Sequence, residues 1–88
     1  LLVLDFTASW CGPCQTLAPK LEILASKCSN VSFFKINHDN PLMLDIFNHF
    51  NVSCMPSLVF LKNGKECTNK IVGLPDIKLL TNTVINFS

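Results

Sequence analysis

The chain has 88 residues, of which 49% are hydrophobic and only 15% charged, and its formal net charge is +1. This length suffices for one small domain, and the high apolar content excludes a disordered chain. No basic run suggests nucleic-acid binding, and the longest apolar runs are far too short to span a membrane.

The first third of the chain predicts a strand followed by a helix. The apolar run over residues 1–6, interrupted only by Asp5, is typical of a buried strand in a parallel sheet. After a loop, Pro13 suits the first turn of a helix. Apolar residues at helical spacing then predict a helix to about Lys27, with a kink at Pro19.

The middle of the chain predicts a second strand and a second helix. Residues 31–37 have the composition of a strand, and a strand–helix–strand order implies a parallel pair with a right-handed crossover. Asn40 and Pro41 form a cap and a first-turn proline. The apolar stripe that follows them, to Phe50, predicts a short amphipathic helix.

The last third predicts two antiparallel strands and a helix. Residues 57–62 form the third strand, and the Asn63-Gly64 turn leads into a fourth over residues 65–72. Pro75 opens the last helix. The residues of this helix expected to face inward are Ile77, Leu80 and Val84. The order β-α-β-α-β-β-α predicts one α/β domain over residues 1–88, a mixed four-stranded sheet with helices on both faces.

Five cysteines cannot all pair within one chain, and only Cys11 and Cys14 are close in sequence. The free N–H groups and dipole of a helix start favour an anion, so we expect the pKa of the Cys11 thiol to lie below that of free cysteine. Cys11 is then the nucleophile of disulfide exchange, and Cys14, one turn on and more covered, is the resolving thiol. The alternatives are a chance pair or half of a zinc site, which would need a second close pair.

The segment Trp10-Cys11-Gly12-Pro13-Cys14 is identical to the thioredoxin active-site motif, and residues 35–39, 52–57 and 60–65 resemble that family as well. The resemblance covers essentially the whole chain. It implies a thioredoxin fold and a thiol–disulfide oxidoreductase that binds no cofactor and no metal. The Gly12-Pro13 pair is typical of the reducing members. The chain resembles the family without its usual first strand and helix, so we expect an N-terminally truncated thioredoxin domain.

The resemblance also implies supporting roles. Asp5 would accept a proton from Cys14, and burial should raise its pKa. Lys35 would lie near Asp5 and moderate that pKa. The Met55–Pro56 bond would be cis, and its loop would face the cysteines and pair with an extended substrate segment.

Three further residues belong to the predicted substrate surface. Trp10 flanks Cys11 and offers apolar contact. Gly73 either allows close approach of a substrate chain or simply ends a strand. Cys54, beside the active site, is either a regulatory thiol, open to glutathionylation or to a dimer-forming disulfide, or a residue with no role. Residues expected to be bystanders are Cys28 in the core and Cys67, His38 and His49 at the surface.

These features predict a cytoplasmic protein disulfide reductase that serves electron transport and cell redox homeostasis. Its substrates would be disulfide-containing proteins, and its electrons would come from NADPH through thioredoxin reductase. We expect a monomer, and the alternative oligomeric state is a dimer linked through Cys54. The alternatives are an oxidase- or isomerase-type domain of a larger secretory protein and a redox-gated adaptor module.

Overall fold

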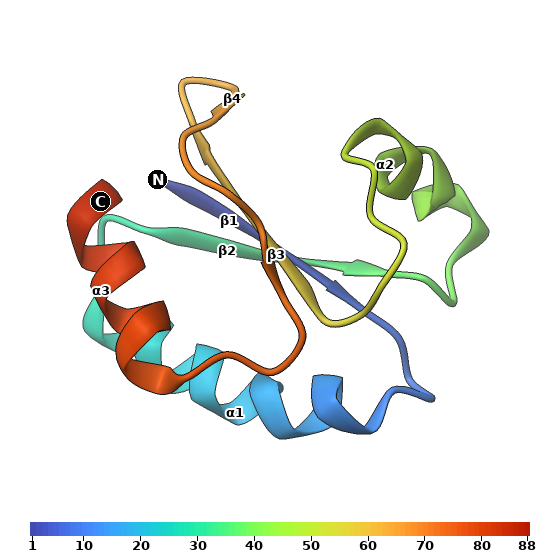
Figure 1. Ribbon diagram of the computed structural model, residues 1–88, viewed down its shortest axis with the longest axis horizontal. Coiled ribbons are helices and arrows are strands. Elements are labelled where there is room, and N and C mark those ends of the chain that lie inside the picture. The colour runs from blue at the N-terminus through green and yellow to red at the C-terminus, as the bar shows by residue number, and fades with distance from the viewer.

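A twisted sheet separates two layers of helices in the computed structural model, which describes all 88 residues (Figure 1). Two helices cover one face, and a shorter helix covers the other. The strands are β1 (Leu2–Thr7), β2 (Ser32–Asn37), β3 (Ser57–Lys62), β4 (Lys65–Glu66) and β5 (Ile71–Val72). The helices are α1 (Gly12–Lys27), the 3₁₀ turn η1 (Pro41–Met43) with α2 (Leu44–His49), and α3 (Ile77–Phe87). None of these helices is long and apolar enough to cross a membrane.

The sheet has the order β2-β1-β3-β4, with β5 also paired to β3. Strands β1 and β2 are parallel, as the strand–helix–strand order predicts, and β3 runs antiparallel to β1. The predicted fourth strand is split, because β4 and β5 pair with the two ends of β3 and residues 67–70 between them leave the ladder. This stretch contains Thr68 and Asn69, and asparagine is disfavoured in strands. An ion pair of 3.0 Å between Lys70 and Glu66 joins the two ends of this irregular stretch.

Strand β1 is buried on both faces, which accounts for its nearly unbroken apolar sequence. Val3 belongs to the core cluster formed with helices α1 and α3. Leu4 and Phe6 belong to a second cluster, formed with α2. Successive side chains of a strand point to opposite faces, so one strand contributes to both cores.

Helix α1 begins directly after the first cysteine of the motif, as predicted. Cys11 is the N-cap, with φ −94° and ψ 109°, and Gly12 and Pro13 are the first helical residues. A proline is tolerated there because the first N–H groups of a helix lack intrahelical partners. The buried face of the helix carries Cys14, Leu17, Leu21 and Leu24. The sequence therefore places both cysteines at the helix start.

The last helix begins two residues later than predicted. The carboxylate of Asp76 caps it, accepting the N–H groups of Lys78 at 2.7 Å and Leu79 at 3.4 Å. The prediction that Ile77 faces inward is wrong, since its side chain is 45% exposed. Ile77 lies in the first turn, beyond the core that Leu80 enters one turn later.

The second helix and two bystander cysteines complete the fold. The Asn40 side chain accepts the N–H of Leu42 at 3.0 Å, which confirms the predicted cap, although the first turn is 3₁₀ rather than α. Cys28 is half-buried at the end of α1 and packs against the core. Cys67 is also half-buried, so its predicted surface position is wrong. Its thiol donates to the Phe60 carbonyl at 3.5 Å and packs against the same core.

Candidate active site

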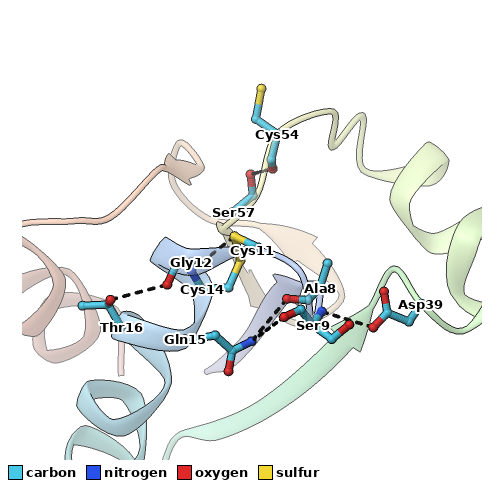
Figure 2. The surroundings of a disulfide bond; sticks show 10 residues. All are labelled: Ala8, Ser9, Cys11, Gly12, Cys14, Gln15, Thr16, Asp39, Cys54 and Ser57. Carbon is cyan, nitrogen blue, oxygen red and sulfur yellow. Dashed lines mark hydrogen bonds between the residues drawn. A yellow bond between two sulfur atoms is a disulfide. The ribbon is translucent and has the colours of Figure 1, made fainter.

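Cys11 and Cys14 form a disulfide at the N-terminus of α1 (Figure 2). Their Cα atoms are 5.3 Å apart. The Sγ atom of Cys11 accepts the backbone N–H of Cys14 at 3.2 Å, so the helix start already directs a donor at this sulfur. The exposed fractions are 6% for Cys11 and 4% for Cys14, so both are covered almost equally. Position at the cap, rather than exposure, distinguishes the two cysteines.

The loop before Cys11 is fixed by neighbours that the sequence did not reveal. The Cys11 N–H donates to the Ala8 carbonyl at 3.2 Å, and the Gln15 side chain donates to Ala8 at 3.3 Å and to Ser9 at 3.5 Å. The Ser9 N–H donates to the Asp39 carboxylate at 3.1 Å (Figure 2). This hydrogen bond lowers the pKa of Asp39 below its ordinary value. The loop after β2 therefore holds the loop after β1.

Asp5 is buried on β1, 5% exposed, on the sheet face covered by α1. Burial raises its pKa from 3.8 to about 6, and the positive charge of Lys35 opposes that rise. Lys35 lies directly across from Asp5 on β2, as expected. The carboxyl group lies in a pocket of about 340 Å³ between α1 and β2, whose lining includes Asp5 and Lys35 but neither active-site cysteine. No hydrogen bond joins Asp5 to Cys14 in this oxidised state.

The loop before β3 faces the disulfide, and its Met55–Pro56 bond is cis, as expected. Met55 packs against the cluster that contains both active-site cysteines. The Pro56 carbonyl accepts the N–H of Gly73 at 2.8 Å. Gly73 has φ +85°, which favours glycine, and a Cβ there would meet nothing within 4 Å. Gly73 directly follows the last residue of β5, and its role in the close approach of a substrate chain stays a prediction.

Exposed apolar side chains flank Cys11 and Gly73, the residue that hydrogen-bonds to the cis-proline. Trp10 is 67% exposed, and Val72 and Leu74, either side of Gly73, are 60% and 47% exposed. Cys54 is exposed, and its thiol points away from the disulfide (Figure 2). An apolar surface next to a disulfide suits contact with a protein substrate.

His38 is exposed, as predicted, but the sequence analysis did not anticipate its two ring contacts. Its imidazole lies edge-on to Trp10, with centroids 6.0 Å apart, and edge-on to Phe47 at 5.2 Å. Sequence separation hid this contact, because no local pattern links residue 10 with residue 38.

A sheet of this topology, with a Cys-x-x-Cys disulfide capping a helix beside a cis-proline loop, defines the class of thiol–disulfide oxidoreductases. The family model for thioredoxin matches residues 1–86. The chain belongs to the thioredoxin family.

Named relatives agree with this assignment. The chain is 49% identical to thioredoxin H8 of Arabidopsis thaliana over 74 residues, which is 84% of this chain and 48% of that protein. It is 42% identical to an H-type thioredoxin of Fagopyrum esculentum over 86 residues, 98% of this chain and 72% of the relative. The X-ray structure of Fasciola hepatica thioredoxin matches with a TM-score of 0.88 at 36% identity, covering 99% of this chain and 80% of that one. The chain thus spans about half the length of the Arabidopsis relative.

Proposed function

We propose that this chain reduces protein disulfides, with Cys11 as the nucleophile and Cys14 as the resolving thiol. The observation that carries the proposal is the hydrogen bond from the Cys14 N–H to the Cys11 sulfur, at the N-terminus of a sixteen-residue helix. The same donor and the helix dipole would stabilise the Cys11 thiolate once the pair is reduced. The thiolate is the attacking form in disulfide exchange.

In the first step, the Cys11 thiolate attacks one sulfur of the substrate disulfide. A bond forms between Cys11 and that sulfur, the substrate S–S bond breaks, and the other substrate sulfur leaves as a thiolate that takes a proton. The exposed indole of Trp10 and the backbone at Met55 and Pro56 border the place where the substrate chain would lie.

In the second step, Cys14 loses its proton and attacks the Sγ of Cys11. The mixed disulfide breaks, the substrate sulfur leaves and is protonated, and the Cys11–Cys14 disulfide forms. Two electrons have then passed from the protein to the substrate. Asp5 is our candidate for the proton acceptor. A carboxyl with a pKa of about 6 is mostly ionised at pH 7, and its pKa is close enough to that pH for the group to take up and release a proton.

The direction of transfer in this proposal is toward the substrate. Gly12 and Pro13 between the cysteines are the pair found in reducing members of the family, and the three relatives above are all named thioredoxins. Both facts favour a reductase over the oxidase-or-isomerase and adaptor alternatives. We propose that electrons return from NADPH through a thioredoxin reductase, the partner that acts on this family.

We further propose a reducing compartment, the cytoplasm, and a role in electron transport and redox homeostasis there. The three cysteines outside the motif, Cys28, Cys54 and Cys67, are free thiols, which persist in a reducing environment. A monomer is the proposed state, and Cys54 is the exposed thiol through which a dimer could form.

Trapping the mixed disulfide tests the proposed roles. The wild-type chain should reduce insulin with dithiothreitol as electron donor, and Cys11→Ser and Cys14→Ser should each lose this turnover. Cys14→Ser should accumulate a covalent adduct with an oxidised protein substrate, since its Cys11 can still attack, whereas Cys11→Ser should not. Mass spectrometry of the non-reduced product identifies the cysteine in the adduct. Adducts through Cys14 in Cys11→Ser, or turnover that survives both changes, would refute the assignment. Cys54→Ser is the matched control for a nearby thiol.

A further inference from the structure

His38 occupies the place where the loop after β2 meets the exposed tryptophan of the active site. The Trp10 indole is 67% exposed and has one aromatic contact, the edge-on imidazole of His38, with centroids 6.0 Å apart and an interplanar angle of 84°. Edge-to-face pairs at this distance are attractive and fix the relative orientation of the two rings. His38 is therefore the aromatic side chain that contacts the indole.

Both the backbone and the ring of His38 contact the body of the domain. Its backbone N–H donates to the Thr7 carbonyl at 2.8 Å, and its ring lies edge-on to Phe47 at 5.2 Å and 87°. Phe47 is 5% exposed and is itself edge-on to Phe6, which is fully buried, at 4.8 Å. A column of four rings thus runs from the core, through Phe6, Phe47 and His38, to Trp10.

The column ends at Trp10, the residue before Cys11. His38 also lines a hollow of about 250 Å³ between α2 and the loop before β3, and Met55 lines the same hollow. Met55 packs against Cys11 and Cys14. His38 therefore contacts the Trp10 indole and also lines a hollow that shares Met55 with the cluster of the two cysteines.

We infer that His38 is a positioning residue for Trp10, and that through Trp10 it sets how well a protein disulfide docks on Cys11. This inference rests on the proposed disulfide reduction. A protein substrate lays a chain against the exposed indole, whereas a small disulfide reaches the sulfurs with little contact to that ring. A mobile indole weakens the docking of the protein substrate more than that of the small disulfide, because the ring must be ordered when the protein chain docks against it.

The chain offers a probe and a matched control for this inference. Trp10 is the only tryptophan, so all indole fluorescence reports on this ring. His49 is the second histidine, is exposed, and lies edge-on to its neighbour Phe50 at 4.7 Å, without an aromatic contact to Trp10. His49→Ala therefore removes the same imidazole from an aromatic contact elsewhere in the chain.

The test compares His38→Ala, His38→Phe and His49→Ala with the wild type. Time-resolved fluorescence anisotropy should show a more mobile indole in His38→Ala. The ratio of its second-order rate constants for insulin and for hydroxyethyl disulfide should fall roughly 3- to 10-fold. His38→Phe keeps an aromatic edge and should restore both values, and His49→Ala should change neither.

Unchanged anisotropy in His38→Ala would overturn the inference, and so would a mobile indole with an unchanged ratio of rate constants. The inference would also be overturned if His38→Phe showed the same mobile indole and the same lowered ratio of rate constants as His38→Ala. An aromatic edge would then not be the property that matters. Failure of the proposed function has a different signature, since the wild type would then reduce neither disulfide while the anisotropy would still report whether His38 holds the ring.

Discussion

The two faces of the sheet carry different chemistry, although the same strand contributes to both. The face covered by α1 and α3 is largely aliphatic and contains one buried carboxyl group, Asp5. The face covered by α2 is built around aromatic rings, with Phe6 edge-on to Phe47 and also to Phe50 at 6.1 Å. The alternation of β1 thus directs Asp5 toward the helix that carries the cysteines and Phe6 toward the rings that α2 contributes to the core. In our proposal the first face contributes the proton acceptor Asp5, and the second supports the ring of His38 beneath Trp10.

The largest expected effect comes from removing the ring at the centre of the aromatic face. Phe47→Ala deletes a side chain that is 5% exposed, and truncations of this kind cost about 3–5 kcal/mol of unfolding free energy. Urea denaturation measures the loss. For a small domain that cost is a large fraction of the stability, so Phe47→Leu serves as the milder variant and should lose less. A loss below about 1 kcal/mol in Phe47→Ala would contradict the central packing role of this ring.

The second effect comes from neutralising the carboxyl group on the opposite face. The pKa of Asp5 is raised from 3.8 to about 6, so the folded state binds the proton more tightly than the unfolded state. Stability is therefore greatest below about pH 4 as far as this group is concerned, and falls as the pH rises to about 6. Asp5→Asn should remove that dependence and raise the unfolding free energy above pH 7, by at most about 3 kcal/mol.

The same variant separates stability from chemistry. Asp5→Asn should slow the release of a preformed mixed disulfide at pH 7, because Cys14 has lost its proton acceptor, while the attack of Cys11 on a substrate should change little. Stopped-flow measurements of the two steps distinguish them. Equal release rates in Asp5→Asn and wild type would remove Asp5 from the mechanism. If the unfolding free energy of Asp5→Asn had the same pH dependence as that of the wild type, the raised pKa of Asp5 would be contradicted.

The smallest effect concerns the hydrogen bond that joins the two loops. Its formation lowers the pKa of the exposed Asp39, so the contact persists at high pH and is lost as the pH falls through that lowered value. Asp39→Asn keeps an acceptor but removes the charge, and Asp39→Ala removes both. Hydrogen exchange of the Ser9 amide should quicken in Asp39→Ala and less so in Asp39→Asn. Equal exchange rates in all three proteins would mean that this carboxylate does not hold the loop.

The elements that rest on local signals could be predicted from the sequence. The helix start at Cys11, the parallel pairing of the first two strands and the hairpin at Asn63-Gly64 each follow from neighbouring residues. The split of the fourth strand and the exposure of Ile77 depend on where the core ends, which no local pattern records.

The candidate site divides in the same way. The cysteine pair and the buried Asp5 stand in one contiguous motif, and resemblance to a family places the cis-proline loop beside them. The hydrogen bond from Ser9 to Asp39 and the contact of Trp10 with His38 join residues about thirty positions apart. Such contacts arise only when parallel strands bring their carboxyl ends to one edge of the sheet.

The reduction potential of the Cys11–Cys14 pair tests the central claim most directly. Equilibration with a glutathione series, with Cys11→Ser and Cys14→Ser as controls, measures it. The account predicts a two-electron couple close to the value of about −270 mV that is the reference for thioredoxin, lost in either variant. A value near about −180 mV, as in protein disulfide isomerase, or no reversible couple at all, would contradict the assignment of this chain as a reductase.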